Sequence, residues 1–133
     1  MSTTLHKLPS AQEVFDIVVD HLFTQGRPAY DGVQGCMYRT HDGLRCAVGV
    51  LIPDDLYDKA FENNQSNFVI QKLFDAGLAD WREHEDILIR LQIIHDNCLK
   101  TEKGTFNLAF LDTDLRNTAA NFSLEYRRPT LAD

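Results

Sequence analysis

The segment of residues 36–53, with the sequence CMYRTHDGLRCAVGVLIP, constrains the fold more than any other part of this chain. It contains two of the three cysteines and the longest apolar run, which begins at Cys46 and ends at Ile52. Such a run is expected to be buried, because leaving it in water forfeits the free energy of apolar burial. We therefore expect this segment to pack in the centre of the fold, where its thiols are inert, metal-bound or reactive.

The local structure of this segment has two interpretations. The Asp42-Gly43 pair is typical of a hairpin turn. Residues 46–52 fit either a buried strand or two turns of buried helix, because the periodicity of a short apolar run cannot separate them. In a hairpin, a two-residue turn places Cys36 and Cys46 on opposite faces, whereas a three-residue turn over 41–43 places them on one face. Only the second register, or the helix, would let the two cysteines share a metal ion or a disulfide.

Helix caps and helical periodicity account for much of the remaining chain. Ser10 and Glu13 match a capping box, and Gly26 suits the left-handed residue that follows a helix, so we expect a helix over 11–25.

A second long helix is expected over 81–99, with Asp80 as its cap. Its apolar face consists of Ile87, Leu88, Leu91, Ile94, His95 and Cys98. Three shorter helices are expected. The first covers 54–61, the second runs from a cap at Ser66 or Asn67 to Ala76, and the third follows a cap at Asp112 or Thr113.

These elements indicate an α+β fold that is predominantly α. The 133 residues, of which 44% are hydrophobic and 25% charged, are sufficient for one domain with its own core. We expect a single domain over 1–133 with about four to six helices and at most a short β-hairpin around residues 36–46. Residues 1–9 and 127–133 are expected to be loose termini.

Composition argues against several classes of function. The net charge of −7, without a basic stripe, opposes direct binding of nucleic acid. No apolar run reaches the ~18 residues that a membrane span needs, and residues 1–9 lack the apolar core of a secretory signal. An odd number of cysteines argues against a secreted disulfide framework. We therefore expect a cytoplasmic protein that uses neither a membrane nor a cofactor.

Two hypotheses give the cysteines a chemical role. Cys46 would be a nucleophile at a helix N-terminus, with His95 as its base and Asp96 as the group that orients the imidazole. Adjacent residues on a helix do not face each other, which argues against Asp96 in that role. Alternatively, Cys36, Cys46, His95 and Cys98 make up the Cys3His set of a structural zinc site, although the spacing of the first two exceeds the usual one.

The simpler interpretation of both groups is buried thiols and a core histidine. On that interpretation the chain has no catalytic residue and no metal ligand. Tyr38 and Arg39 are the candidate binding residues: Arg39 would hold an anion at the mouth of a pocket, or else pair internally with Asp42 or another acid. The sequence has no phosphate-binding loop, serine-hydrolase motif or zinc-protease motif.

Four short sequences carry a resemblance to a known group of proteins. They are Gln25-Gly26, Cys36-x-Tyr38-Arg39, Asp42-Gly43-x-x-Cys46-Ala47-Val48-Gly49-x-Leu51-Ile52-Pro53-Asp54 and Ile94-His95-Asp96. The chain resembles, over residues 11–125, a group of small uncharacterised proteins encoded by bacteriophages and prophages. The region around Cys46 is also similar to small bacterial proteins whose Cys-Ala-Leu-Gly run is thought to be helical, which favours a short buried helix at 46–52.

The resemblance implies a phage or mobile-element origin and transfers no activity, ligand or catalytic residue. Small phage proteins of this kind often bind host machinery, which is an analogy between proteins and not a property of these residues. We expect a non-enzymatic module that inhibits or sequesters a host protein or a small ligand, as a monomer or a homodimer. The alternatives are a cysteine-dependent hydrolase or transferase and a zinc-stapled interaction domain.

Overall fold

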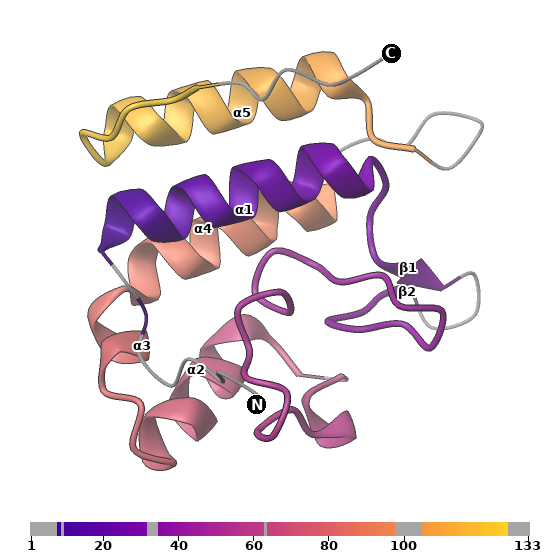
Figure 1. Cartoon of the computed structure of the whole chain (residues 1–133), viewed down its shortest axis with the longest axis vertical. Coiled ribbons are helices and arrows are strands. Elements are labelled where there is room, and N and C mark those ends of the chain that lie inside the picture. Colours follow the sequence, from indigo (N-terminus) through magenta and orange to yellow (C-terminus); the bar gives the residue numbers. More distant parts are fainter. Residues whose placement is uncertain (1–7, 9, 32–34, 63, 98–104, 128–133) are drawn as a thin grey trace, which may run out of the picture.

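Three helices lie side by side: α1 (Ala11–Gln25), α4 (Glu85–Asn97) and α5 (Leu108–Asn121). In the computed structural model, which describes residues 8, 10–31, 35–62, 64–97 and 105–127, α4 contacts both of the others (Figure 1). The shorter α2 (Ser66–Asp75) and α3 (Asp80–Glu83) pack against each other and against α4, at the opposite end from α5. The described part of the chain is therefore mostly α-helical, which confirms the predicted fold class.

The sequence predicted α1 with its bounds. Ser10 Oγ accepts a hydrogen bond from the Glu13 backbone N–H at 3.3 Å, and Gly26 has the left-handed φ of 73°. The buried face of the helix consists of Val14, Phe15, Val18, Val19, Leu22 and Phe23.

The only sheet in the described residues is a pair of two-residue strands, β1 (Tyr30–Asp31) and β2 (Gly35–Cys36). The hairpin expected around residues 36–46 is reduced to one antiparallel bridge between Arg39 and Arg45, which is the register of the three-residue turn. From residue 37 to residue 58 the chain then runs as an irregular segment beside α1 and α2 (Figure 1).

The apolar run at 46–52 is neither the strand nor the short helix that was considered. It forms a single turn, in which the Val50 N–H donates to the Cys46 carbonyl at 3.1 Å and the Leu51 N–H donates to the Val48 carbonyl at 3.0 Å. This turn packs closely against the segment before it, because a Cβ on Gly49 would lie 2.0 Å from the Tyr38 carbonyl oxygen. The expected burial is confirmed, since Cys46 and Val48 have no exposed surface.

The three shorter predicted helices all begin differently in the structure. The region expected as a helix over 54–61 is a turn after Pro53 followed by a short 3-10 helix, η1 (Lys59–Phe61), which Asp58 caps. Ser66 lies inside α2 and does not cap it. α5 begins at Leu108, before the predicted caps, because the Asn107 side chain accepts hydrogen bonds from the Ala109 and Phe110 N–H groups.

The helix expected over 81–99 is interrupted at His84, which separates α3 from α4. Asp80 does not cap it, because the Trp81 N–H already donates to the Leu78 carbonyl at 3.1 Å and places Asp80 inside the first turn. The predicted apolar face is buried from Ile87 to His95. Cys98 and the end of the predicted helix lie outside the described residues, as do residues 1–7 and 128–133.

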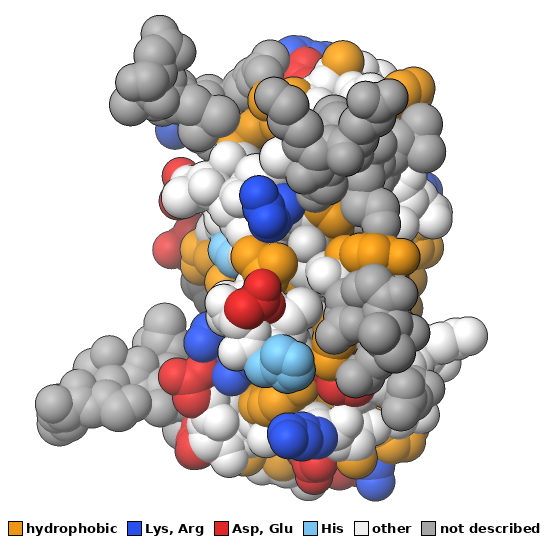
Figure 2. Space-filling view, turned by 90° about the vertical axis from the view of Figure 1, so that its right-hand side faces the viewer, with side chains coloured by type: hydrophobic (Ala, Val, Ile, Leu, Met, Phe, Trp, Pro, Cys, Tyr) orange, Lys and Arg blue, Asp and Glu red, His pale blue; other side chains and the backbone are white. Residues whose placement is uncertain are grey.

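None of the described helices combines the length and the apolar content that crossing a bilayer requires. On the face shown in Figure 2, acidic and basic side chains are interspersed with apolar ones, and the described residues form no broad basic area there.

Candidate functional site

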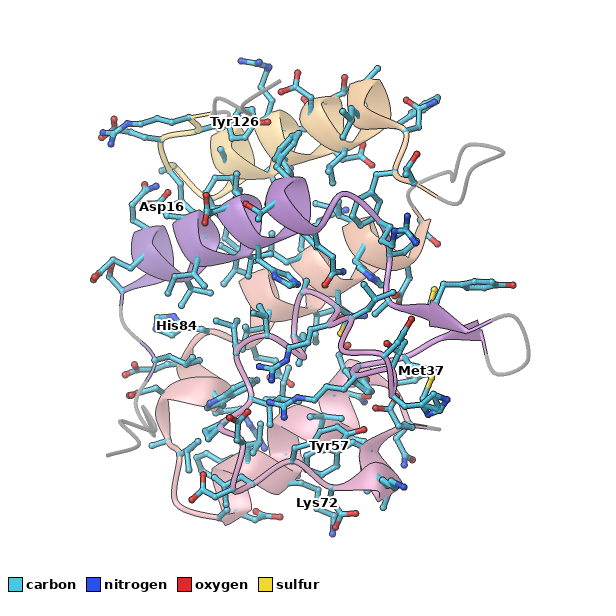
Figure 3. All side chains as sticks on the ribbon, turned by 45° about the vertical axis from the view of Figure 1, so that its right-hand side comes forward. Asp16, Met37, Tyr57, Lys72, His84 and Tyr126 are labelled. Atoms are coloured by element: carbon cyan, nitrogen blue, oxygen red, sulfur yellow. The ribbon has the colours of Figure 1, made fainter. Side chains whose placement is uncertain are left out.

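A cavity of about 610 Å³ opens beside β2, between the segment that follows this strand, the turn before α2, and α4. Its apolar walls are Met37, Tyr38, Ile89 and Ile93, and its polar lining is Cys36, Glu62, Asn64, Gln65, Ser66, Asn67, Gln92 and Asp96. Met37 is seen next to the strands in Figure 3. A volume of this size suits a small molecule or a few side chains of a partner.

Asp96 lies in the cavity wall, near the C-terminal end of α4, and the buried His95 forms a hydrogen bond with its carboxylate. The His95 ring is fully buried, and its Nε2 accepts a hydrogen bond from the Ala29 backbone N–H at 2.9 Å. The ring proton must therefore lie on Nδ1, which donates to Asp96 Oδ1 at 2.8 Å. The sequence argument that Asp96 would not meet the imidazole of its neighbour is wrong, because the short aspartate side chain reaches back to Nδ1.

Gln92 holds the same carboxylate oxygen from one helical turn earlier. Its Nε2 donates to Asp96 Oδ1 at 2.9 Å, and its Oε1 accepts from the Val48 N–H at 3.0 Å. The backbone donor fixes the orientation of the amide, since Oε1 must face Val48 and the NH₂ group must face the aspartate. Two buried side chains thus fix the Asp96 carboxylate, while the aspartate side chain stays 40% exposed and lines the cavity.

Glu62, the second carboxylate of the cavity, already accepts hydrogen bonds from other parts of the protein. It accepts hydrogen bonds from the Tyr38 N–H at 2.8 Å and the Arg39 N–H at 3.1 Å, and a further short one from the Tyr57 hydroxyl. Burial and this carboxylate raise the pKa of the Tyr57 phenol, so it remains a donor. Glu62 therefore links residues 38 and 39 to the turn before α2.

Of the two predicted binding residues, Tyr38 lines the cavity and Arg39 does not. The Tyr38 hydroxyl donates to the Asn64 carbonyl at 2.8 Å, and burial raises its pKa to about 12. Arg39 points to the other side, where it donates to the Ile52 carbonyl at 2.6 Å and pairs with Asp54 at 3.0 Å. Its guanidinium also stacks on Tyr57, which is labelled in Figure 3, at 4.7 Å from the ring centroid.

Arg39 thus forms an internal ion pair, the second of the two roles expected from the sequence, although its partner is Asp54 and not Asp42. Burial is the main cause that lowers the pKa of Arg39, followed by the neighbouring charge of Arg45, which also lies 3.6 Å from Asp54. An anion would have to displace the carboxylate that already lies between the two guanidinium groups.

Cys46 is placed where a nucleophile cannot work. Its side chain is completely buried, and its Sγ accepts a hydrogen bond from the Gly49 N–H at 3.1 Å. Burial raises the pKa of this thiol well above its usual range. The proposed base cannot help, because the one lone pair of the His95 ring is taken by Ala29.

We expect Cys46 to react with iodoacetamide at least about 100-fold more slowly than Cys36 in the native protein, since its labelling requires an opening of the core. Cys36 is exposed and needs no such opening. Mass spectrometry of timed digests measures both rates. Fast labelling of Cys46, with a pH midpoint below ~8.5, would instead support the nucleophile hypothesis.

Of the predicted zinc ligands, the described part of the chain brings together Cys36 and His95 but not Cys46. Their group also contains Asp96, and its ligand atoms lie within 4.8 Å of one another, while Cys98 lies outside the described residues. A metal ion on Nδ1 of His95 would move the ring proton to Nε2, opposite the Ala29 N–H. Metal-bound histidines normally donate through their second nitrogen, and here that nitrogen faces a donor.

His21 lies apart from the cavity on α1, with its Nε2 at 2.8 Å from the Arg45 carbonyl. Burial is the main cause that lowers its pKa below 6.5. A lowered pKa means that folding favours the neutral ring, so this contribution to stability is complete above pH 6.5 and is lost as the pH falls through the folded-state pKa. An NMR titration of the His21 ring should give a midpoint below 6.5, and a midpoint at or above 6.5 would contradict this assignment.

Sequence reasoning missed Gln92 and Glu62, which build the site. Gln92 lies four residues before Asp96, a spacing at which glutamine and aspartate pair on a helix, so this pair was detectable. Glu62 gave no such pattern, because its partners are backbone groups 23 and 24 residues away.

Comparison with known proteins identifies no relative of this chain. No protein-family model matches the chain, and neither a curated protein nor a solved structure is found to be similar to it.

Proposed function

We propose that this chain is a non-enzymatic binding module that inhibits or sequesters a host component by holding part of it in the cavity beside Asp96. The observation that supports this most is the Asp96 carboxylate, which two buried side chains, His95 and Gln92, hold in the cavity wall. Such pre-orientation lowers the entropic cost of ligand binding. The resemblance to phage and prophage proteins is the reason for assigning the ligand to a host.

Binding is favoured over catalysis by the state of the reactive groups. The Cys46 thiol is buried with a raised pKa, and the acceptor nitrogen of His95 is used by the backbone. The lining open to a ligand includes the Asp96 carboxylate, the Cys36 thiol, several amides and apolar surface. Such groups bind a molecule through charge, hydrogen bonds and apolar contact, which supports recognition.

The test is capture from bacterial lysate followed by native mass spectrometry, with a variant that fills the cavity. Ile93→Trp would place an indole in the cavity wall, where Ile93 is 43% exposed. Ile17→Trp is the matched control, because Ile17 on α1 is 41% exposed and does not line the cavity.

We expect the wild type and Ile17→Trp to retain one stoichiometric component that Ile93→Trp loses. Retention by all three proteins would place the binding elsewhere. Recovery of no component from several hosts would overturn the proposed function.

A further inference from the structure

The charges of the cavity select the kind of ligand it takes. Its lining contains two carboxylates, Glu62 and Asp96, and no lysine, arginine or histidine among the described residues. An anionic ligand would enter against both charges. An apolar ligand would remove water from Asp96 without replacing the lost hydrogen bonds, which is costly.

Of the two carboxylates, Asp96 is the one that can accept further hydrogen bonds from a ligand. Glu62 already accepts two backbone N–H groups and a tyrosine hydroxyl. The bonds to Asp96 all go to Oδ1, and within the described part of the chain Oδ2 has no hydrogen-bond partner. Its two donors, the Nδ1–H of His95 and the amide of Gln92, are both neutral, so they orient the carboxylate and leave its negative charge in place.

The apolar residues of the lining indicate that the rest of the ligand is apolar. Met37, Ile89 and Ile93 present aliphatic surface on the same cavity as Asp96. Ile93 is three residues before Asp96 on α4, so an apolar chain lying along this helix would bring its end to the Asp96 carboxylate.

We infer that the cavity takes an alkylammonium group, which pairs with Asp96 Oδ2 while its alkyl chain lies on Met37, Ile89 and Ile93. This inference rests on the proposed function and names the ligand class of the same site. The group belongs either to a free amine or to a lysine side chain of a protein, since the two present the same chemistry. His95 and Gln92 act as positioning residues that hold the carboxylate in place.

The experiment is a set of NMR titrations of the full chain with hexylammonium chloride, 1-hexanol and sodium hexanoate. Asp96→Asn removes the charge but keeps an oxygen that accepts from His95 and Gln92, so the fold is expected to persist, and its amide spectrum checks this. Asp86→Asn, an exposed aspartate on the same helix outside the cavity, is the control for net charge.

Wild type and Asp86→Asn should bind hexylammonium at least about tenfold more tightly than hexanol, with shifts in residues 36–38 and 89–96, and Asp96→Asn should lose this preference. A titration with Nα-acetyl-lysine amide separates the two sources: tighter binding than hexylammonium assigns the group to a protein side chain, and weaker binding assigns it to a free amine.

Equal or tighter binding of hexanol or hexanoate, an undiminished preference in Asp96→Asn, or no binding of hexylammonium would overturn the ligand class. The proposed function would survive these results if Ile93→Trp still lost the component captured from lysate, so the two failures are distinguishable.

Discussion

Gly49→Ala is expected to lower the free energy of unfolding by about 3 kcal/mol, a cost at the upper end for overpacking a buried site. The added Cβ would lie 2.0 Å from the Tyr38 carbonyl oxygen and 3.2 Å from Cys46 Sγ. The carbonyl cannot yield easily, because it accepts a hydrogen bond from the Cys46 N–H at 3.1 Å and belongs to a residue whose N–H donates to Glu62. Urea denaturation, followed by circular dichroism, measures the change.

Gly77→Ala is the matched control for this prediction. No atom lies within 4 Å of the Cβ it would add, so its cost comes only from the left-handed φ of 103° and should be about 1 kcal/mol. A loss in Gly49→Ala no larger than that in Gly77→Ala would show that the close approach of the Tyr38 carbonyl is relieved at little cost.

His95→Leu is expected to cost about 2–3 kcal/mol of stability, because it removes both nitrogens of a fully buried ring. The Ala29 N–H would lose its acceptor in the core, and Asp96 would lose the Nδ1–H donor. The leucine would also replace an edge-to-face contact with Phe106, whose ring lies 5.8 Å from the imidazole. Thermal and urea unfolding both report the loss.

His21→Leu provides the comparison, since that ring is partly exposed and its contact is with one carbonyl, that of Arg45. Its cost should be clearly smaller than that of His95→Leu. A His95→Leu protein as stable as the wild type would mean that the bonds to Ala29 and Asp96 contribute little to the fold.

The sequence predicted those parts of the fold whose signals are local. Ser10, Glu13 and Gly26 predict both ends of α1, and the helical spacing of apolar residues predicts the buried face of α4. The start of α5 was missed because Asn107 was not considered as a cap and the Asp112 pattern suggested a later one. The conformation of residues 46–52 could not be predicted, because the contact between Gly49 and the Tyr38 carbonyl joins two segments through tertiary packing.

The candidate site was predictable only in pieces. His95 and Asp96 were named from the sequence, but as parts of a cysteine mechanism, and their hydrogen bond was argued against. What assigns them a different role is the Ala29 N–H on the far side of the imidazole, 66 residues away in the sequence. A backbone donor carries no sequence pattern, so the protonated nitrogen of His95, and with it the orientation of Asp96, emerges only from the fold.

The central claim is that a neutral His95, with its proton on Nδ1, holds the Asp96 carboxylate in the cavity wall. Nitrogen-15 NMR of the imidazole tests this directly at neutral pH, because protonated and unprotonated ring nitrogens have well-separated chemical shifts. The structure predicts a protonated Nδ1 and an unprotonated Nε2 that accepts the Ala29 N–H. A proton on Nε2, whether in the other neutral form or in the imidazolium, would contradict the network on which the binding site depends.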